Sequence, residues 1–360
     1  MPLVAHSKLP TFSRLREEGQ TVLDPSRANR QEIRELHIGL LNMMPDAALT
    51  ATERQFFRLV GDSNQIAQFY LHPFTLPELE RGDEARAYIE EHYRPIDDVK
   101  AEGLDALIVT GANVTQPDLA KEPFWKPLAD VIEWASESVT STLCSCLATH
   151  AVMQHRYRQH RRHLGSKCWG VFPHRVVDRR HPLVHGANTK FDVPHSRFNS
   201  IHREQFEAAG CHVLVEGEDS GVHLAVSEDR FRLVMFQGHP EYDTTSLLKE
   251  YKREVTLYAD GQRPSHPPFP DHYLSARLRA VLEEYRERLD AAVEKGVAWP
   301  KFPEEFVETE LDNTWRDSAG AVIDNWIGKV YQLTHPSRKK AFMDGVDPSD
   351  PLGLGGGSSA

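Results

Sequence analysis

Two short motifs carry side chains able to perform nucleophilic chemistry on a carbonyl group. The sequence Cys144-Ser145-Cys146 stands at the end of an apolar run, and the sequence His239-Pro240-Glu241 follows a second apolar run later in the chain. A thiolate is a strong nucleophile, and a histidine oriented by a carboxylate can take up and return a proton. Together these residue types make a nucleophile, a base and a residue that orients the base.

The position of Cys146 favours it as the nucleophile. The stretch "VTSTLCSCLATHAVMQ" (139–154) predicts a buried strand that runs directly into a helix, with Cys146 at the turn. Such a turn exposes the side chain, and nearby backbone N–H groups can form an oxyanion hole. The helix N-terminus also favours a thiolate. Cys144 lies inside the strand, so we expect it to be a packing residue.

His239 and Glu241 are expected to be the base and its orienting partner. A lone buried cysteine is most often an inert packing residue, and we assign that role to Cys168 and Cys211. The order strand, cysteine and helix, followed by strand and His-Pro-Glu, makes a chemical role for Cys146 more probable than it is for either of those.

The surrounding elements predict an α/β protein. The expected strands cover 36–43, 65–74, 104–112 and 139–146, and the expected helices cover 50–61, 123–138, 244–258, 273–296 and 315–332. Apolar strands that alternate with helices indicate a parallel sheet covered on both faces. Three short strands are expected over 211–237. Ligands bind beyond the carboxyl ends of such strands, where both motifs fall.

We expect four regions along the chain. They are a polar N-terminal surface extension (1–35), a catalytic domain (36–260), a Pro-rich linker with C-terminal helices packed on the same domain (261–340), and a flexible tail (341–360).

Composition excludes several classes of protein. The chain has 360 residues and a formal net charge of −11, which argues against non-specific binding of nucleic acid. No apolar run reaches the roughly 18–20 residues of a membrane span, and the N-terminus lacks the apolar core of a signal peptide. Four cysteines do not form a disulfide framework. We therefore expect a cytoplasmic protein with neither nucleic-acid nor membrane partners.

Seven segments together resemble one known family. The segments "LNMMP", "DALIVTGA", "VTSTLCSCLA", "SKCWGVFPH", "VPHSRF", "FQGHPEYD" and "NWIGKVYQLTHP" resemble the homoserine O-succinyltransferases, or homoserine O-acyltransferases, a branch of the class I glutamine amidotransferase superfamily. The resemblance spans residues 13–336. It implies a three-layer, flavodoxin-like fold with a mostly parallel sheet. It also implies a homodimer without a bound cofactor or metal that uses acyl-CoA and L-homoserine in methionine biosynthesis.

The resemblance also implies roles for individual residues. Cys146 would carry the acyl thioester, His239 would be the general base with Glu241 as its partner, and the mechanism would be ping-pong. The N–H of Leu147 and one from the 110–115 turn would hold the oxyanion. The residues implied in substrate binding are Lys167, Ser196 and Arg253, the last of these holding the amino-acid carboxylate.

Two positions depart from the family pattern. Where the family has glycine with succinyl-CoA or glutamate with acetyl-CoA, this chain has Thr115, which is small and neutral and so favours succinyl-CoA. The family's lysine after Asn-x-Met-Pro is replaced by the run Asp46 to Ala48, so we expect a positive charge to be missing near the acyl pocket. Acetyl-CoA as donor and serine as acceptor remain alternatives.

Two other functions and one basic segment are considered next to this resemblance. A glutamine amidotransferase commonly has G-x-C-x-G at the elbow, whereas this chain lacks both glycines around Cys146 and shows no ammonia-using domain. An inactive binding homologue would not need a thiol and base pair. The basic run 155–163 is interpreted as a solvated helix end, with contact to CoA phosphates as the alternative.

Overall fold

The computed structural model describes residues 3–30, 33–63 and 67–355. Its strands are β1 Leu3–Val4, β2 Val22–Leu23, β3 Glu35–Leu41, β4 Gln68–Phe74, β5 Ala106–Val109, β6 Ser141–Ser145, β7 Arg162–Val176, β8 Lys190–Ser200, β9 His212–Gly217, β10 Gly221–Val226 and β11 Leu233–Phe236. Its α-helices are α1 Pro10–Glu17, α2 Pro25–Ala28, α3 Leu49–Asp62, α4 Asp83–His92, α5 Ile96–Glu102, α6 Trp125–Ser138, α7 Leu147–Tyr157, α8 Arg203–Ala208, α9 Ser246–Ala259, α10 Ala276–Lys295, α11 Glu304–Thr309 and α12 Arg316–Leu333.

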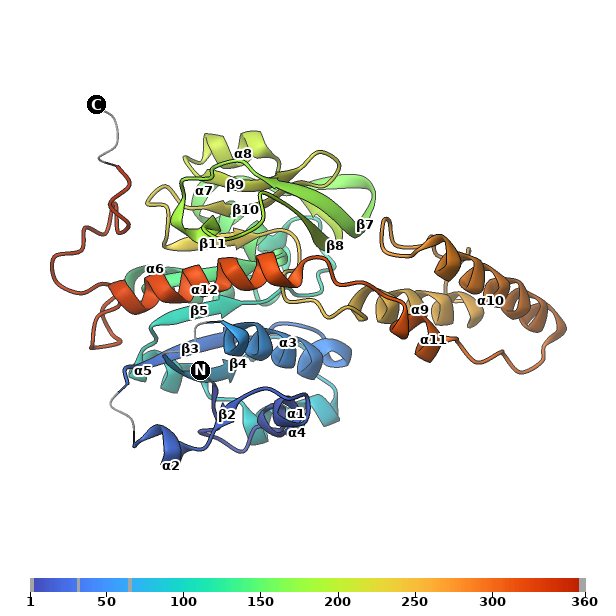
Figure 1. The fold of residues 1–360 in the computed structure, drawn as a ribbon, viewed down its shortest axis with the longest axis horizontal. Coiled ribbons are helices and arrows are strands. Elements are labelled where there is room, and N and C mark those ends of the chain that lie inside the picture. The colour runs from blue at the N-terminus through green and yellow to red at the C-terminus, as the bar shows by residue number, and fades with distance from the viewer. Residues whose placement is uncertain (1–2, 31–32, 64–66, 356–360) are drawn as a thin grey trace.

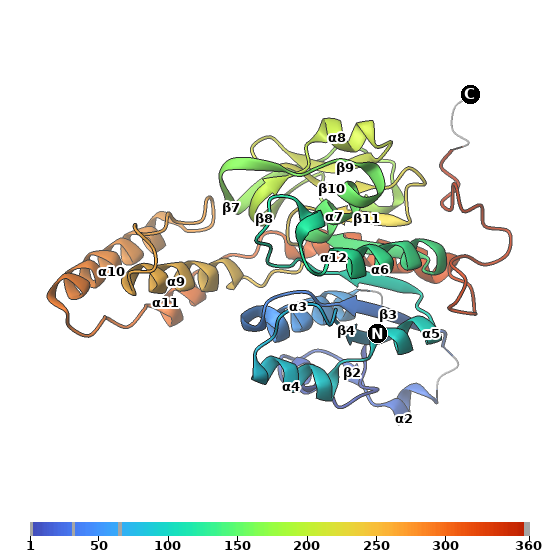
Figure 2. The same cartoon turned by 180° about the vertical axis from the view of Figure 1, so that it is seen from behind.

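The described strands form one mixed sheet with helices on both faces (Figures 1 and 2). The strand order is β2-β1-β4-β3-β5-β6-β11-β10-β9-β7-β8. Every pairing from β2 to β11 is parallel, and every pairing from β11 to β8 is antiparallel. The expected α/β class with a mostly parallel sheet is confirmed. The parallel half brings the carboxyl ends of β5, β6 and β11 to the same edge.

Strands β5 and β11 are apolar throughout because both of their faces are buried. In β5, Ala106 and Ile108 belong to one core cluster, and Leu107 and Val109 belong to the other. This alternation follows from the two-residue period of a strand. A continuous apolar run is therefore needed to fill two cores.

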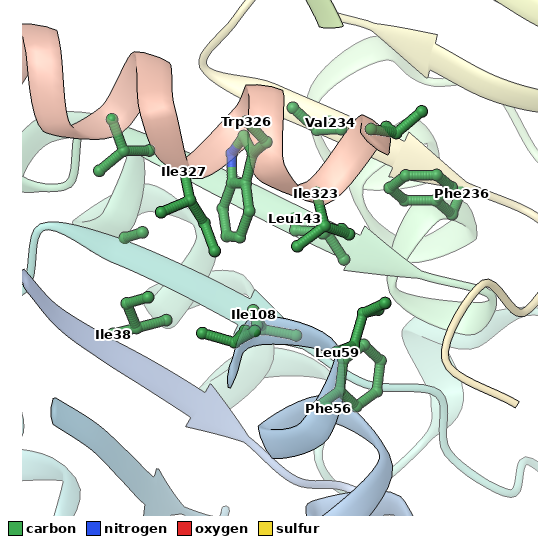
Figure 3. Close-up of a cluster of buried hydrophobic side chains, with 14 of the residues drawn as sticks. Ile38, Phe56, Leu59, Ile108, Leu143, Val234, Phe236, Ile323, Trp326 and Ile327 are labelled. Carbon is green, nitrogen blue, oxygen red and sulfur yellow. The ribbon is translucent and has the colours of Figure 1, made fainter. Parts of the chain in front are cut away.

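One core lies between the sheet and helices α3 and α12 (Figure 3). Phe56 of α3 and Ile323 and Trp326 of α12 are almost completely buried there, against Ile108 and Leu143. The second core lies between the sheet and helices α6 and α7. Helix α7, which follows Cys146, is buried along most of its length because it packs in this layer.

Helices α9, α10 and α11 form an arm that projects from the sheet body (Figure 1). The arm has an apolar core, in which Tyr251 of α9 packs with Leu282 of α10 and with Phe302, and this core includes Trp169 and Val171 of β7. The arm is therefore anchored on the sheet at strand β7.

The N-terminal segment differs from the expected surface extension. Strand β1 pairs in parallel with β4, and β2 pairs with β1, so this segment extends the sheet. Phe12 and Leu15 of α1 are buried in the core beside α3. The segment looked polar because only one face of α1 is apolar.

The start of the expected tail also packs on the body. Phe342 is buried, and Arg232 lies over its ring at 4.8 Å from the ring centroid. Residues 356–360 lie outside the described residues. In the described part of the chain, no helix is both long and apolar enough to cross a membrane.

Candidate active site

Cys146 occupies a strained turn between β6 and α7. Its backbone angles are φ 52° and ψ −106°, which is unusual for a residue other than glycine. Strain of this kind concentrates at functional sites, and a nucleophile elbow has this geometry. The Cys146 N–H donates to the carbonyl of Phe236 at 2.8 Å, and so the turn is tied to the end of β11.

Thr149 strengthens the tie between these two strand ends. Its hydroxyl lies 2.9 Å from the carbonyl oxygen of Cys144 and 2.8 Å from that of Phe236. Cys144 is buried in the core on the α7 side of the sheet, and burial raises the pKa of its thiol to about 12. Cys144 is thus a packing residue, whereas the Cys146 side chain is only partly covered.

His239 and Glu241 form a buried pair on the loop that follows β11. Nδ1 of His239 lies 2.8 Å from Oε1 of Glu241. Burial by itself would lower the pKa of His239, but the Glu241 carboxylate and an interaction with Cys146 outweigh it and raise the pKa to about 10. Nε2 of His239 is buried and bonds to no other described residue, which leaves it to interact with the Cys146 side chain.

Gly238 allows the histidine loop to approach strand β8 closely. A Cβ atom on Gly238 would lie 2.5 Å from Cγ1 of Val193 and 2.9 Å from the ring of His195. The N–H of His239 donates to the carbonyl of Pro194 at 2.8 Å. The Gly-His-Pro-Glu motif therefore needs its glycine for close packing. The hydrogen bond to Pro194 fixes the position of the His239 backbone relative to β8.

A half-buried glutamate of α9, Glu250, brings two of the expected substrate-binding residues together. Its Oε2 atom accepts from Ser196 Oγ at 2.6 Å, from Trp169 Nε1 at 2.9 Å and from Lys167 Nζ at 3.3 Å. Burial would raise the pKa of Glu250, but the Lys167 ammonium and the hydrogen bonds from Ser196 and Tyr242 hold it below its usual range. Glu250 is therefore ionised in a shielded position.

Tyr242 connects this carboxylate to the catalytic loop. Its hydroxyl donates to Oε1 of Glu250 at 2.8 Å, and its ring stacks on His239 with the ring centroids 4.2 Å apart. The cluster around Glu250 thus lies directly beside the His239 and Glu241 pair.

Arg253 makes no hydrogen bond or ion pair with Glu250. Its side chain is 58% exposed and contacts the neighbouring Glu254 at 3.3 Å. It lies three residues after Glu250 on α9, a spacing that places both side chains on the same side of the helix.

The turn after β5 lies against the elbow. A Cβ atom on Gly111 would be 3.8 Å from Cβ of Cys146. Further along the turn, Oε1 of Glu122 accepts from the N–H groups of Thr115 and Gln116, each at 2.7 Å. Thr115 is exposed, and its backbone is fixed by this buried carboxylate.

Asp46 has a positively charged partner in the folded chain. Arg81, from a different segment, donates to the carbonyl of Met44 at 2.5 Å and pairs with Oδ1 of Asp46 at 3.2 Å. Its side chain is only 7% exposed. The Gly82 N–H and the Arg81 guanidinium lower the pKa of Asp46. A cation therefore lies at this turn, although no lysine follows the Asn-x-Met-Pro motif.

Sequence reasoning missed Tyr242, Asp243, Glu250 and Arg161. Tyr242 and Asp243 complete the motif "GHPEYD", and Glu250 lies one helical turn before Arg253. The sequence next to residues already singled out could therefore have indicated all three. Arg161 was hidden inside the basic run 155–163. In the described residues, no group of three or more His, Cys, Asp or Glu side chains is arranged to hold a metal ion.

The mostly parallel sheet, the strained turn at Cys146 and the buried histidine and glutamate pair define an α/β protein with a candidate active site at the carboxyl ends of its parallel strands. A solved glutamine amidotransferase from Thermotoga maritima is 11% identical, with a TM-score of 0.45 over 82% of this chain and 98% of that chain.

Comparison with relatives in sequence identifies one particular family. A family model described as homoserine O-succinyltransferase matches residues 2–336. The homoserine O-succinyltransferase of Allochromatium vinosum is 65% identical over 98% of this chain and 99% of its own length, and that of Nitrosococcus oceani is 64% identical over the same shares. The chain belongs to the homoserine O-succinyltransferase family.

Proposed function

We propose that this chain transfers a succinyl group from succinyl-CoA to the hydroxyl of L-homoserine, by way of an acyl-thioester on Cys146. The observation that carries the proposal is the strained Cys146 elbow next to the buried His239 and Glu241 pair. The names of the relatives support the choice of donor and acceptor.

In the first half-reaction, the Cys146 thiolate attacks the thioester carbonyl of the donor. The raised pKa of His239 means that its imidazole is protonated at neutral pH, where it stabilises the thiolate. The first N–H group of a helix has no partner within the helix, so the N–H of Leu147 is available to the oxyanion together with one from the 110–115 turn. CoA then leaves, and His239 supplies a proton to its sulfur.

In the second half-reaction, His239 is neutral and acts as the base. It takes the proton of the homoserine hydroxyl, whose oxygen attacks the thioester. Acylation has removed the charge of Cys146, and this charge was one cause of the high pKa of His239. The histidine is therefore a better proton acceptor at this stage than in the free enzyme.

The amino-acid acceptor has an amino group and a carboxylate to recognise. The Arg253 guanidinium suits the carboxylate, because an arginine fork binds a carboxylate through two hydrogen bonds. Glu250 is an ionised carboxylate beside His239 and suits the ammonium group. Lys167 and Ser196 hold Glu250 in place.

Thr115 is assigned to donor selection. It is small and neutral, so it neither fills the acyl pocket nor repels a succinyl carboxylate. No bound cofactor is needed, since side chains supply every proton transfer. We include a homodimer and a cytoplasmic location in the proposal, on the basis of the family resemblance, and light scattering of the purified chain tests the dimer.

Intact-protein mass spectrometry tests the reaction. The protein is mixed separately with succinyl-CoA and with acetyl-CoA, without an acceptor. We expect a succinyl adduct in the wild type and in Cys168→Ala, none in Cys146→Ala, and loss of the adduct when homoserine is added. An acetyl adduct alone would make the donor assignment wrong. With no adduct from either donor, the transferase proposal fails, and a glutaminase assay would follow.

A further inference from the structure

The donor proposed above carries a free carboxylate, so a succinyl pocket needs a positive charge near Cys146. In the described part of the chain, two arginines interact electrostatically with Cys146, namely Arg161 and Arg197. Arg81 lies near the same turn, but its charge is paired with that of Asp46. The charge of His239 is likewise paired with that of Glu241. The question is which arginine has a hydrogen-bond donor free for a substrate.

Arg197 has no donor nitrogen to spare. Its Nε donates to Nδ1 of His195 at 3.3 Å, its Nη1 donates to the carbonyl of Asn199 at 3.0 Å, and its Nη2 donates to the carbonyl of Ser220. The side chain is also buried. Arg197 is therefore part of the framework beneath the site.

Arg161 differs from Arg197 both in its free donor nitrogen and in its exposure. Its Nη2 donates to the carbonyl of Gln116 at 2.7 Å, and Nε and Nη2 lie 3.4 Å from the carbonyl of Pro117. Its Nη1 donates to no described residue and is not sealed from solvent. The guanidinium therefore holds Gln116 and Pro117, in the turn whose first glycine, Gly111, lies against Cys146, and it keeps one donor nitrogen free.

The charge of Arg161 also lacks a direct partner. The side chain is half-buried, and no described carboxylate lies within ion-pair distance of it. Glu122, whose charge acts on Arg161, uses Oε1 to hold the N–H groups of Thr115 and Gln116. Partly buried charges are normally paired, so this cation lacks an anion that a substrate could supply.

We propose that Arg161 binds the distal carboxylate of the succinyl group through Nη1 and thereby selects succinyl-CoA over donors without that carboxylate. The 111–117 turn and Arg161 form one unit, because the guanidinium holds the turn through two backbone carbonyls. Thr115 leaves the pocket open and Arg161 supplies its charge. The inference rests on the proposed succinyl transfer and names the residue that recognises the donor.

The test compares succinyl-CoA with butyryl-CoA, which has the same four-carbon chain but no carboxylate. Arg161→Gln is expected to lower kcat/KM for succinyl-CoA by about 10- to 100-fold, the usual effect of losing a hydrogen bond between charged groups. Its kcat/KM for butyryl-CoA is expected to fall much less, since that donor loses only the support that Arg161 gives to the turn, so the ratio of the two values should drop. Because both donors contain CoA, an effect on CoA binding would lower both values together.

Arg162 provides a matched control. It is the next residue and the first of β7, it is exposed, and its side chain makes no hydrogen bond or ion pair with a described residue, so Arg162→Gln loses the same charge without touching the turn. We expect no change in donor selectivity in this variant. A parallel loss for both donors in Arg161→Gln, or a selective loss of succinyl-CoA in Arg162→Gln, would overturn the inference.

Arg161→Lys covers the case in which the glutamine variant does not fold. Lysine keeps the charge but loses the fork geometry, so the preference for succinyl-CoA should fall between those of wild type and Arg161→Gln. An unaltered preference in a folded Arg161→Lys protein contradicts the inference. Failure of wild type to form a succinyl adduct would instead defeat the proposed function itself.

Discussion

At the scale of single residues, the protonation of His239 is the property that most distinguishes this site. A histidine of ordinary pKa is mostly neutral at pH 7, whereas Glu241 and Cys146 raise the pKa of His239 to about 10 despite its burial. The resting site therefore contains an imidazolium that is paired with Glu241 and lies next to Cys146. In the proposed mechanism, this imidazolium supplies the proton that the departing CoA thiolate needs.

This raised pKa predicts a pH-dependent contribution to stability. A group with a pKa near 10 in the fold, against 6.5 in an unfolded chain, stabilises the fold fully below pH 6.5. The contribution is lost as pH rises through about 10. Urea unfolding of wild type and His239→Gln at several pH values should give a stability difference that shifts against the wild type over this range. Parallel curves would show that the pKa is not raised.

At the scale of elements, helix α3 holds the loop that carries His239. Arg54 and Arg58 of α3 both form ion pairs with Asp243, two residues after Glu241. Gln55 also contacts Asp243, at 3.3 Å. Because Asp243 and both arginines are largely shielded from water, this contact fixes the loop more firmly than an exposed ion pair would.

Asp243→Asn tests this connection. The substitution keeps the shape of the side chain but leaves the shielded Arg58 without its acid, at a cost of about 3 kcal/mol in the free energy of unfolding. We expect kcat to fall at least about tenfold as His239 loses its position. Asp130→Asn is the matched control, since Asp130 pairs with Lys126 on an exposed helix surface, and it should leave both quantities unchanged. Equal effects in the two variants would contradict a positioning role for Asp243.

At the scale of the whole molecule, the C-terminal helix α12 completes the core beneath the catalytic strand (Figure 3). Trp326 is fully buried, and its Nε1 donates to Oγ of Ser141 on β6 at 2.8 Å. Strand β6 ends at the residue before Cys146. The support of the elbow therefore depends on a helix far away in the sequence.

Two tryptophans separate core packing from surface exposure. Trp326→Ala should lower the free energy of unfolding by about 3–5 kcal/mol, because it leaves a large cavity and removes the partner of Ser141. Trp299, near the end of the arm, is 44% exposed, and Trp299→Ala should have little effect on stability. Chemical denaturation of both variants measures the difference. A similar loss in both would mean that the arm contributes to the same cooperative core.

The sequence by itself was enough to predict the α/β class, the strand-to-helix turn at Cys146 and the His239 and Glu241 motif. These features depend on local patterns: apolar runs, helical spacing and residues that are neighbours in the chain. The elements over 36–74 and 104–146 therefore lie close to where the sequence placed them.

Only the tertiary structure revealed Glu250 as the meeting point of Lys167 and Ser196, Arg81 as the cation beside Asp46, and Arg161 against the 111–117 turn. Each of these contacts joins segments whose distance in space depends on strand order and helix packing. No local pattern records that distance. The pairing of the N-terminal strand β1 could not be predicted for the same reason, because its partner β4 becomes adjacent only after the chain folds.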